Sequence, residues 1–207
     1  MGAPADFAWH VCQRRQEYQG ESRANLLRVC AIAAFYAVEL VNYRGLDLLG
    51  LHLPKVAGVD WRFHLAMTVL AGAWALTGWA VLVLLRAGFF PGRLKFASTA
   101  CDLAYLTAIL LVADGPKSPL AVAYFPLLAL AGLRFDLALV RFAGAGAGLG
   151  YALLLAHSAW LRPEALVPGY AAVTFLLALA FTAVWLGQVI RRSRDLARDY
   201  ASRRDRP

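Results

Sequence analysis

Six long apolar stretches in this chain of 207 residues set the strongest limit on its fold. Most have about the 17–25 residues that a helix needs to cross about 30 Å of hydrocarbon. In lipid such a segment forms a helix, because a helix satisfies its own backbone hydrogen bonds. We therefore predict an all-α polytopic membrane protein with six transmembrane helices, at residues 24–43, 63–85, 96–113, 119–135, 142–160 and 170–190.

The composition excludes several other classes of protein. Hydrophobic residues make up 60% of the chain and charged residues only 16%, whereas soluble domains carry about 25% charged residues. The three cysteines have no C-x-x-C spacing, so neither a disulfide framework nor a zinc site is indicated. A soluble enzyme, a disordered chain and a secreted disulfide scaffold are therefore excluded.

The distribution of basic residues predicts the orientation of the six segments. Pro126 makes the fourth segment either a kinked span or a re-entrant one. If all six segments cross, fifteen Lys and Arg residues share a face with both termini and five lie on the other face. The positive-inside rule then places both termini in the cytoplasm of a plasma-membrane protein, with an N-terminal tail at 1–23 and a basic helical tail at 191–207. We expect this charge to attract anionic lipid of the inner leaflet, and we expect no nucleic-acid binding.

Two charged residues lie at matching depths inside predicted spans. Arg28 is about one turn, and Asp102 nearly two turns, from the cytoplasmic end of its segment. A charge in hydrocarbon needs a partner, so we predict an ion pair between Arg28 and Asp102. In the alternative, Arg28 extends to the lipid headgroups and Asp102 bonds a nearby hydroxyl such as that of Ser98.

A second group of polar residues lies near the outer ends of three segments. Glu39, His64 and His157 would form a pH-sensing or metal-binding cluster if the three segments bring them together. Separate interfacial side chains are the alternative, because no H-x-x-x-H or H-E-x-x-H spacing is present.

The fifth segment carries closely spaced glycines. Gly144, Gly146, Gly148 and Gly150 form two overlapping G-x-x-x-G patterns, without the Lys-Ser/Thr of a phosphate loop. Such patterns let another helix approach closely. That helix belongs either to the same chain or to a second copy in a homodimer.

Two further segments are assigned by their composition. Asp114, Gly115, Ser118 and Pro119 predict a structural turn on the outer side, in which Ser118 caps the fourth helix and Pro119 opens it. The last segment continues without a helix breaker into a basic cytoplasmic tail that we interpret as a stop-transfer anchor. Its basic residues include Arg191, Arg192, Arg194, Arg198, Arg203 and Arg204.

Residues 102–151 resemble a known arrangement. Asp102 is followed by a Gly-x-x-Ser-Pro-Leu turn at 115–120, by Tyr124-Phe125, by Leu133-Arg134-Phe135, and by a glycine-rich helix ending in Tyr151. This pattern is similar to the six-helix N-terminal membrane regions of bacterial sensor histidine kinases and membrane-bound nucleotide cyclases. The resemblance implies a sensor or regulatory subunit whose output domain, a cytoplasmic kinase or cyclase, lies on another polypeptide. It carries over no catalytic residue, metal or cofactor.

Other functions remain as alternatives. Six helices with both ends inside also resemble the substrate-binding subunits of energy-coupling-factor vitamin importers, whose first helix docks through an Ala-x-x-x-Ala face that Ala33 and Ala37 match. The motifs of CDP-alcohol phosphatidyltransferases, prenyl proteases and rhomboid proteases are missing from the sequence. We therefore expect a protein without enzymatic activity.

Overall fold

The architecture comes from a computed structural model, which describes residues 4–48, 51–53, 60–88 and 92–204, with side chains described at 20–45, 60–88 and 92–196. These ranges hold six α-helices, which are α1 (Pro4–Arg44), α2 (Trp61–Arg86), α3 (Leu94–Val112), α4 (Tyr124–Gly132), α5 (Leu137–Leu161) and α6 (Gly169–Arg204). They also hold three short 3-10 helices and two strands, which are η1 (Gly115–Lys117), η2 (Pro119–Ala123), η3 (Pro163–Ala165), β1 (Leu46–Leu48) and β2 (Leu51–Leu53).

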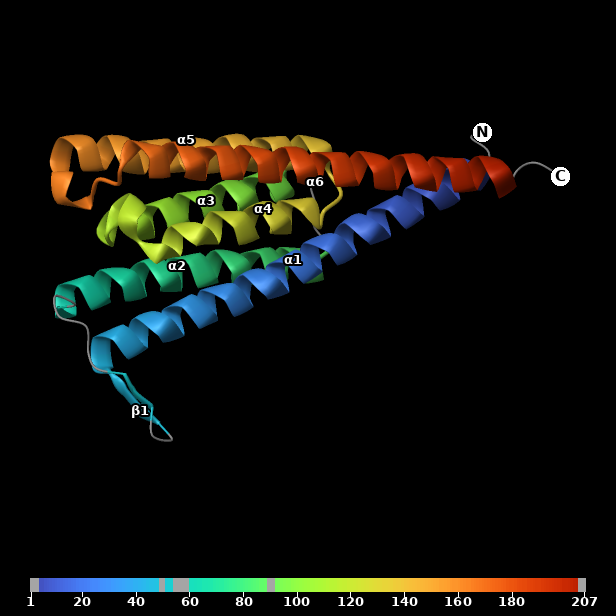
Figure 1. The fold of residues 1–207 in the computed structure, drawn as a ribbon. Helices are drawn as coiled ribbons and strands as arrows, with labels where there is room; N and C mark the ends of the chain where they lie inside the picture. The colour runs from blue at the N-terminus through green and yellow to red at the C-terminus, as the bar shows by residue number, and fades with distance from the viewer. Residues whose placement is uncertain (1–3, 49–50, 54–59, 89–91, 205–207) are drawn as a thin grey trace.

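Successive helices run in opposite directions along one bundle (Figure 1). Both chain termini extend from one end of the bundle, which we call the terminal end. The α1–α2, α3–α4 and α5–α6 connections lie at the opposite end, which we call the hairpin end. Two termini at one end agree with an even number of passes, as six segments require.

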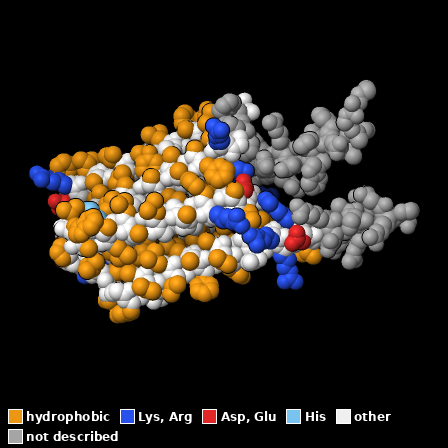
Figure 2. All heavy atoms as spheres, turned by 90° about the horizontal axis from the view of Figure 1, so that it is seen from above, with side chains coloured by type: hydrophobic (Ala, Val, Ile, Leu, Met, Phe, Trp, Pro, Cys, Tyr) orange, Lys and Arg blue, Asp and Glu red, His pale blue; other side chains and the backbone are white. Residues whose placement is uncertain are grey.

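Five helical segments within the described residues are long and apolar enough to cross a membrane, namely Gly20–Arg44, Trp61–Arg86, Leu94–Val112, Leu137–Leu161 and Gly169–Leu196. Apolar side chains cover most of the face of the bundle in Figure 2, whereas charged side chains stand near its two ends. Soluble monomers rarely expose so large an apolar surface. The helices are therefore consistent with a membrane location.

The fourth segment is shorter than the span predicted at 119–135. The structure has η2 followed directly by α4, together Pro119–Gly132. Five 3-10 residues and nine α-helical residues extend over about 24 Å, less than the thickness of the hydrocarbon layer. The helix stops because the chain turns at Phe135, whose φ of 50° is left-handed and incompatible with continuing a helix.

The surroundings of α4 explain how a short segment is accommodated. Pro126 is the third residue of α4, within the first turn, where proline is tolerated. The segment changes its helical geometry before Pro126, at Ala123–Tyr124, where the 3-10 helix becomes an α-helix. Helices α3, α5, α6 and α1 all contact α4, so protein covers most of it, although Pro126 and Ala129 are exposed.

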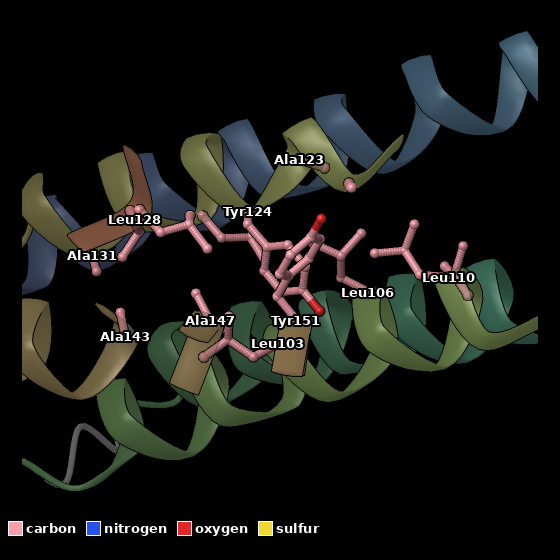
Figure 3. Packing of buried hydrophobic residues seen from close by; sticks show 14 of the residues in the cluster. Leu103, Leu106, Leu110, Ala123, Tyr124, Leu128, Ala131, Ala143, Ala147 and Tyr151 are labelled. Atoms are coloured by element: carbon pink, nitrogen blue, oxygen red, sulfur yellow. The ribbon is translucent and has the colours of Figure 1, made fainter. Parts of the chain in front are cut away.

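The core of the bundle forms where α4 meets α3 and α5 (Figure 3). Tyr124 and Leu128 of α4 are fully buried and face Leu106 of α3 together with Ala147 and Tyr151 of α5. The Tyr124 hydroxyl hydrogen-bonds Thr107 of α3, with 2.8 Å between the oxygens, so this buried phenol is paired.

Two other features differ from the sequence-based expectation. The connection after α1 contains a short antiparallel hairpin in which Leu46 pairs with Leu53, a small addition to an all-α fold. The segment 1–23, predicted as a tail, is helical from Pro4 onward and continuous with the first span. No helix breaker separates the polar start of α1 from its apolar part, because the only glycine there, Gly20, lies within the helix.

The start of α5 is fixed by Asp136, the last residue of the α4–α5 turn. Its Oδ1 accepts hydrogen bonds from the backbone N–H groups of Ala138 (2.9 Å) and Leu139 (3.4 Å), and its Oδ2 pairs with Lys95 Nζ of α3. Burial alone would raise the pKa of Asp136, but the Lys95 ammonium and the two N–H donors together hold that pKa below its ordinary value. The carboxylate thereby ties α5 to α3.

We expect Asp136 to make the stability of the bundle sensitive to acid. Its folded pKa is lower than the value of about 3.9 in an unfolded chain. Its contribution is complete above that value and is lost as the pH falls through the folded pKa. Thermal unfolding in detergent from pH 7 to pH 3 should show that Asp136→Asn is less stable than the natural chain at pH 7, with the difference shrinking in acid. Parallel profiles would contradict this role.

The glycines of α5 pack against helices of the same chain. A Cβ added at Gly144 would lie 2.8 Å from Ala183 Cβ of α6, and one added at Gly146 would lie 2.7 Å from Leu103 Cδ1 of α3. At Gly150 it would lie 2.7 Å from Thr107 Oγ1 and 2.8 Å from the Tyr124 hydroxyl. At Gly148 nothing lies within 4 Å. Three of the four glycines therefore serve close approach within the chain.

Alanine substitutions should separate these glycines. Gly150→Ala pushes a methyl group into the bonded Thr107–Tyr124 pair, so we expect a loss of about 1–3 kcal/mol. Gly148→Ala meets open space and should leave stability unchanged or slightly raised, since alanine favours helix. Thermal unfolding of both variants in one detergent measures the difference. Equal effects would show that the close approach at Gly150 is not required.

Candidate functional site

The two charged residues expected inside the membrane lie together in the structure. Arg28 Nε of α1 is 2.7 Å from Asp102 Oδ1 of α3, and both side chains are almost completely buried. The same Asp102 oxygen accepts a hydrogen bond of 2.8 Å from Trp74 Nε1 of α2. One carboxylate thus joins three helices.

Neighbouring polar groups complete the surroundings of Arg28. Its Nη1 donates to Asn25 Oδ1 at 2.6 Å, and Asn25 Nδ2 donates to the Gly78 carbonyl of α2 at 2.9 Å. A side chain at position 78 would press against this contact, because a Cβ there would lie 3.3 Å from Val29 Cγ2 and 3.6 Å from Asn25 Oδ1. The alternative of a hydroxyl partner does not apply, because Ser98 bonds Glu21 and the Lys95 carbonyl instead.

A second buried ion pair lies beside the first and was not predicted. Arg134 Nε, in the α4–α5 turn, is 2.7 Å from Glu21 Oε2 of α1, and Arg134 Nη2 donates to Glu21 Oε1 at 2.8 Å. The two side chains are only 5% and 1% exposed. Thr99 Oγ1 of α3 accepts a further bond from Arg134 Nη1 at 2.6 Å.

The predicted boundaries place Glu21 in the N-terminal tail and Arg134 at the end of the fourth segment. One signal could have linked Glu21 to the buried set: it precedes Arg28 by seven residues, which places both on one face of a helix. Burial lowers the pKa of the Arg134 guanidinium, while the Glu21 carboxylate opposes that change. The two pairs together bring two positive and two negative charges into the protein interior, so the group is balanced.

The predicted cluster of Glu39, His64 and His157 forms only in part. His64 Nδ1 lies 3.0 Å and 3.1 Å from the two carboxylate oxygens of Glu39, and the Tyr43 ring stacks on the imidazole at 4.1 Å. No described contact joins His157 to this pair. The three-residue prediction is corrected because α5, which carries His157, packs on α3, α4 and α6, whereas α1 and α2 pack on each other.

The described residues contain no group of three His, Cys, Asp or Glu side chains that could hold a metal ion. Glu39 and His64 alone provide two ligand groups, fewer than structural metal sites use. Their contact therefore acts as a polar link between α1 and α2.

The turn at residues 114–119 is ordered by local contacts at the hairpin end. Ser118 Oγ accepts a hydrogen bond from the Leu120 N–H at 3.3 Å, and Pro119 is the first residue of η2. Gly115 has a φ of +57°, and a Cβ there would lie 3.0 Å from Ser158 Oγ of α5. Asp114 precedes η1 without forming a side-chain cap. The turn serves packing, as its composition suggests.

The basic tail continues α6 as a helix. Arg191 and Arg192 are exposed, and Arg194 donates from Nη2 to the Phe135 carbonyl in the α4–α5 turn. The side chains of the remaining predicted tail residues, Arg198, Arg203 and Arg204, lie outside the described side chains, although their backbone belongs to α6. The α4–α5 turn is therefore bonded to α1 through Arg134, to α3 through Asp136 and to α6 through Phe135.

Comparisons with protein-family models, with curated proteins and with solved structures find no match to this chain.

We expect removal of either partner of the Arg28–Asp102 pair to destabilise the bundle. Arg28→Met leaves a buried carboxylate without its counter-charge, a change that costs about 3–5 kcal/mol. Arg28→Met combined with Asp102→Leu should recover most of that loss, because no charge then remains unpaired. Thermal and denaturant unfolding in detergent measure the stability of the natural chain, of Arg28→Met and of the double variant.

Glu164→Gln is the matched control for this experiment. Glu164 pairs with Arg162 at 3.4 Å, but its side chain is 70% exposed. Exposed pairs contribute about 0–1 kcal/mol, so this variant should be nearly neutral. If Arg28→Met were as mild as Glu164→Gln, the buried pair would not hold the helices together.

Proposed function

We propose that this chain is a non-enzymatic sensor or regulatory subunit of the plasma membrane that relays a signal through α6 to a cytoplasmic kinase or cyclase. In this proposal both termini are cytoplasmic, and the outer face or the bilayer provides the signal. The observation that carries it is the α6 helix, which runs unbroken from apolar span into basic extension, Gly169–Arg204, and is bonded to the α4–α5 turn.

The bonding of the α4–α5 turn supports a relay. Arg134 of this turn is held by Glu21 of α1, and the next residue, Phe135, accepts the bond from Arg194 of α6. A shift of α1 relative to the core would thus act on the turn and through it on α6. Phe135 has a positive φ, a strained conformation for a residue with a side chain and a feature often found at switch regions.

The charge distribution supports the orientation. The arginines of the α6 extension, together with Arg86, Arg93 and Arg141, lie at the same end as both termini. The positive-inside rule assigns such an end to the cytoplasm. The resemblance of residues 102–151 to the membrane regions of sensor kinases and cyclases supports the same role, and it suggests an output domain on a separate polypeptide.

The basic extension provides the test. We expect the full chain, purified gently from its native cells, to bring down a kinase or cyclase that mass spectrometry identifies. Replacing Arg191, Arg192 and Arg198 by Gln should reduce that recovery about tenfold or more, since each contributes to a charged contact. Gln keeps the helix, because its helix propensity is close to that of Arg.

The control replaces the same three residues by Lys, which keeps the charge and should retain most of the recovery. If the Gln variant retains its partner in full, α6 is not the output element. The importer subunit would be favoured instead if the chain brought down a transport ATPase rather than a kinase. Substituting Ala33 and Ala37, which are exposed on α1, should then abolish that recovery.

A further inference from the structure

An apolar crevice lies between α1, α2 and α3, away from the turn that contacts α6. Its walls are stripes of side chains at helical spacing, including Ile32, Phe35 and Tyr36 of α1, Met67 and Trp74 of α2, and Leu106 of α3. It encloses roughly 400 Å³ of empty space, its open mouth included. Ligand sites are mostly apolar, with few polar groups that fix the ligand's orientation.

One carboxyl group lines this crevice. Glu39 continues the α1 stripe one turn beyond Tyr36 and is only 7% exposed. Among the described residues its two oxygens share a single side-chain partner, Nδ1 of His64. A carboxylate can accept about four hydrogen bonds, so Glu39 has acceptor capacity that its buried surroundings do not use.

The other polar groups of the crevice are already bonded. The Tyr36 hydroxyl pairs with Thr68 Oγ1 at 3.0 Å, and Trp74 Nε1 donates to Asp102 at 2.8 Å. Both rings nevertheless line the crevice beside Phe35. Aromatic faces attract cations within about 6 Å of the ring centre, so these walls favour a positively charged ligand as much as an apolar one.

We propose that this crevice binds a lipid-soluble amine, with its ammonium group at Glu39 and its apolar or aromatic body between Phe35, Met67 and Leu106. The ammonium N–H groups would use the free acceptor positions of the carboxylate, a charge-assisted bond that low-dielectric surroundings strengthen. This site does not depend on the role of α6 and is a separate claim from the proposed function.

The test compares two probes of nearly the same shape. The full chain in lipid nanodiscs is titrated with 4-phenylbutylamine and with 4-phenylbutanol by calorimetry, and empty nanodiscs supply the correction for partitioning. We expect saturable binding of one amine per chain and at least about tenfold weaker binding of the alcohol, the difference that a bond to a charged group makes.

Three variants separate the charge from the cavity. Glu39→Gln should weaken the amine about tenfold or more and leave the alcohol unchanged. Ala71→Phe places a ring in the crevice, of which Ala71 is a lining residue, and should weaken both probes. Asp114→Asn removes an exposed carboxylate of the outer turn and should change neither.

Two results would overturn the proposal. Amine and alcohol binding with equal strength would show that Glu39 does not select the ligand. Binding that survives in Ala71→Phe would place the probes elsewhere on the bundle. Circular dichroism is the folding control. If each variant keeps the α-helical spectrum of the natural chain, a loss of binding comes from the change in the crevice and not from unfolding.

Discussion

The arrangement of the helices depends on two buried ion pairs near the terminal end, Arg28–Asp102 and Glu21–Arg134. Asp102 holds α1 through Arg28 and α2 through Trp74, while Arg134 holds the α4–α5 turn against α1 and α3. An uncompensated charge in such surroundings is far more costly than a lost apolar contact. Helices α1, α2 and α3 can therefore adopt few rotations other than the one in which every charge finds its partner. Leu106, Tyr124 and Leu128 then fill the space between the helices.

The sequence predicts how deep a residue lies along its helix better than it predicts which helices pack against each other. Hydropathy predicted the apolar segments, and equal depth within them pointed to Arg28 and Asp102 as partners, which the structure brings together. Equal depth also suggested His157 beside Glu39 and His64, but depth does not say which helices share an interface. The Glu21–Arg134 pair was not predicted for a related reason. Both residues lie where hydropathy marks the end of a segment, and only the packing of α1 against the turn makes that place an interior.

The short α4 and the glycines of α5 belong to one packing arrangement. A helix covered by protein need not match the thickness of a bilayer, because its ends meet other side chains rather than headgroups. Gly150 lets α5 approach the Thr107–Tyr124 pair, and Gly144 lets it approach Ala183 of α6. Hydropathy could not foresee the shortened segment, since Leu133 and Phe135 beyond its end are as apolar as the helix itself. A left-handed residue, Phe135, ends it instead.

The unbroken course of α6 has a mechanical consequence. Its 36 residues form a rod of about 54 Å, so a tilt of about 5° displaces one tip by about 5 Å relative to the other. No glycine or proline after Gly187 offers a joint at which such a swing would be absorbed. The Arg194 bond to Phe135 lies between the two arms of this lever and makes the α4–α5 turn its fulcrum. About 38 Å of α6 lies on the bundle side of Arg194 and about 15 Å on the other side, so a tilt about this point moves the tip by less than it moves the start of α6, with no need for any helix to unfold.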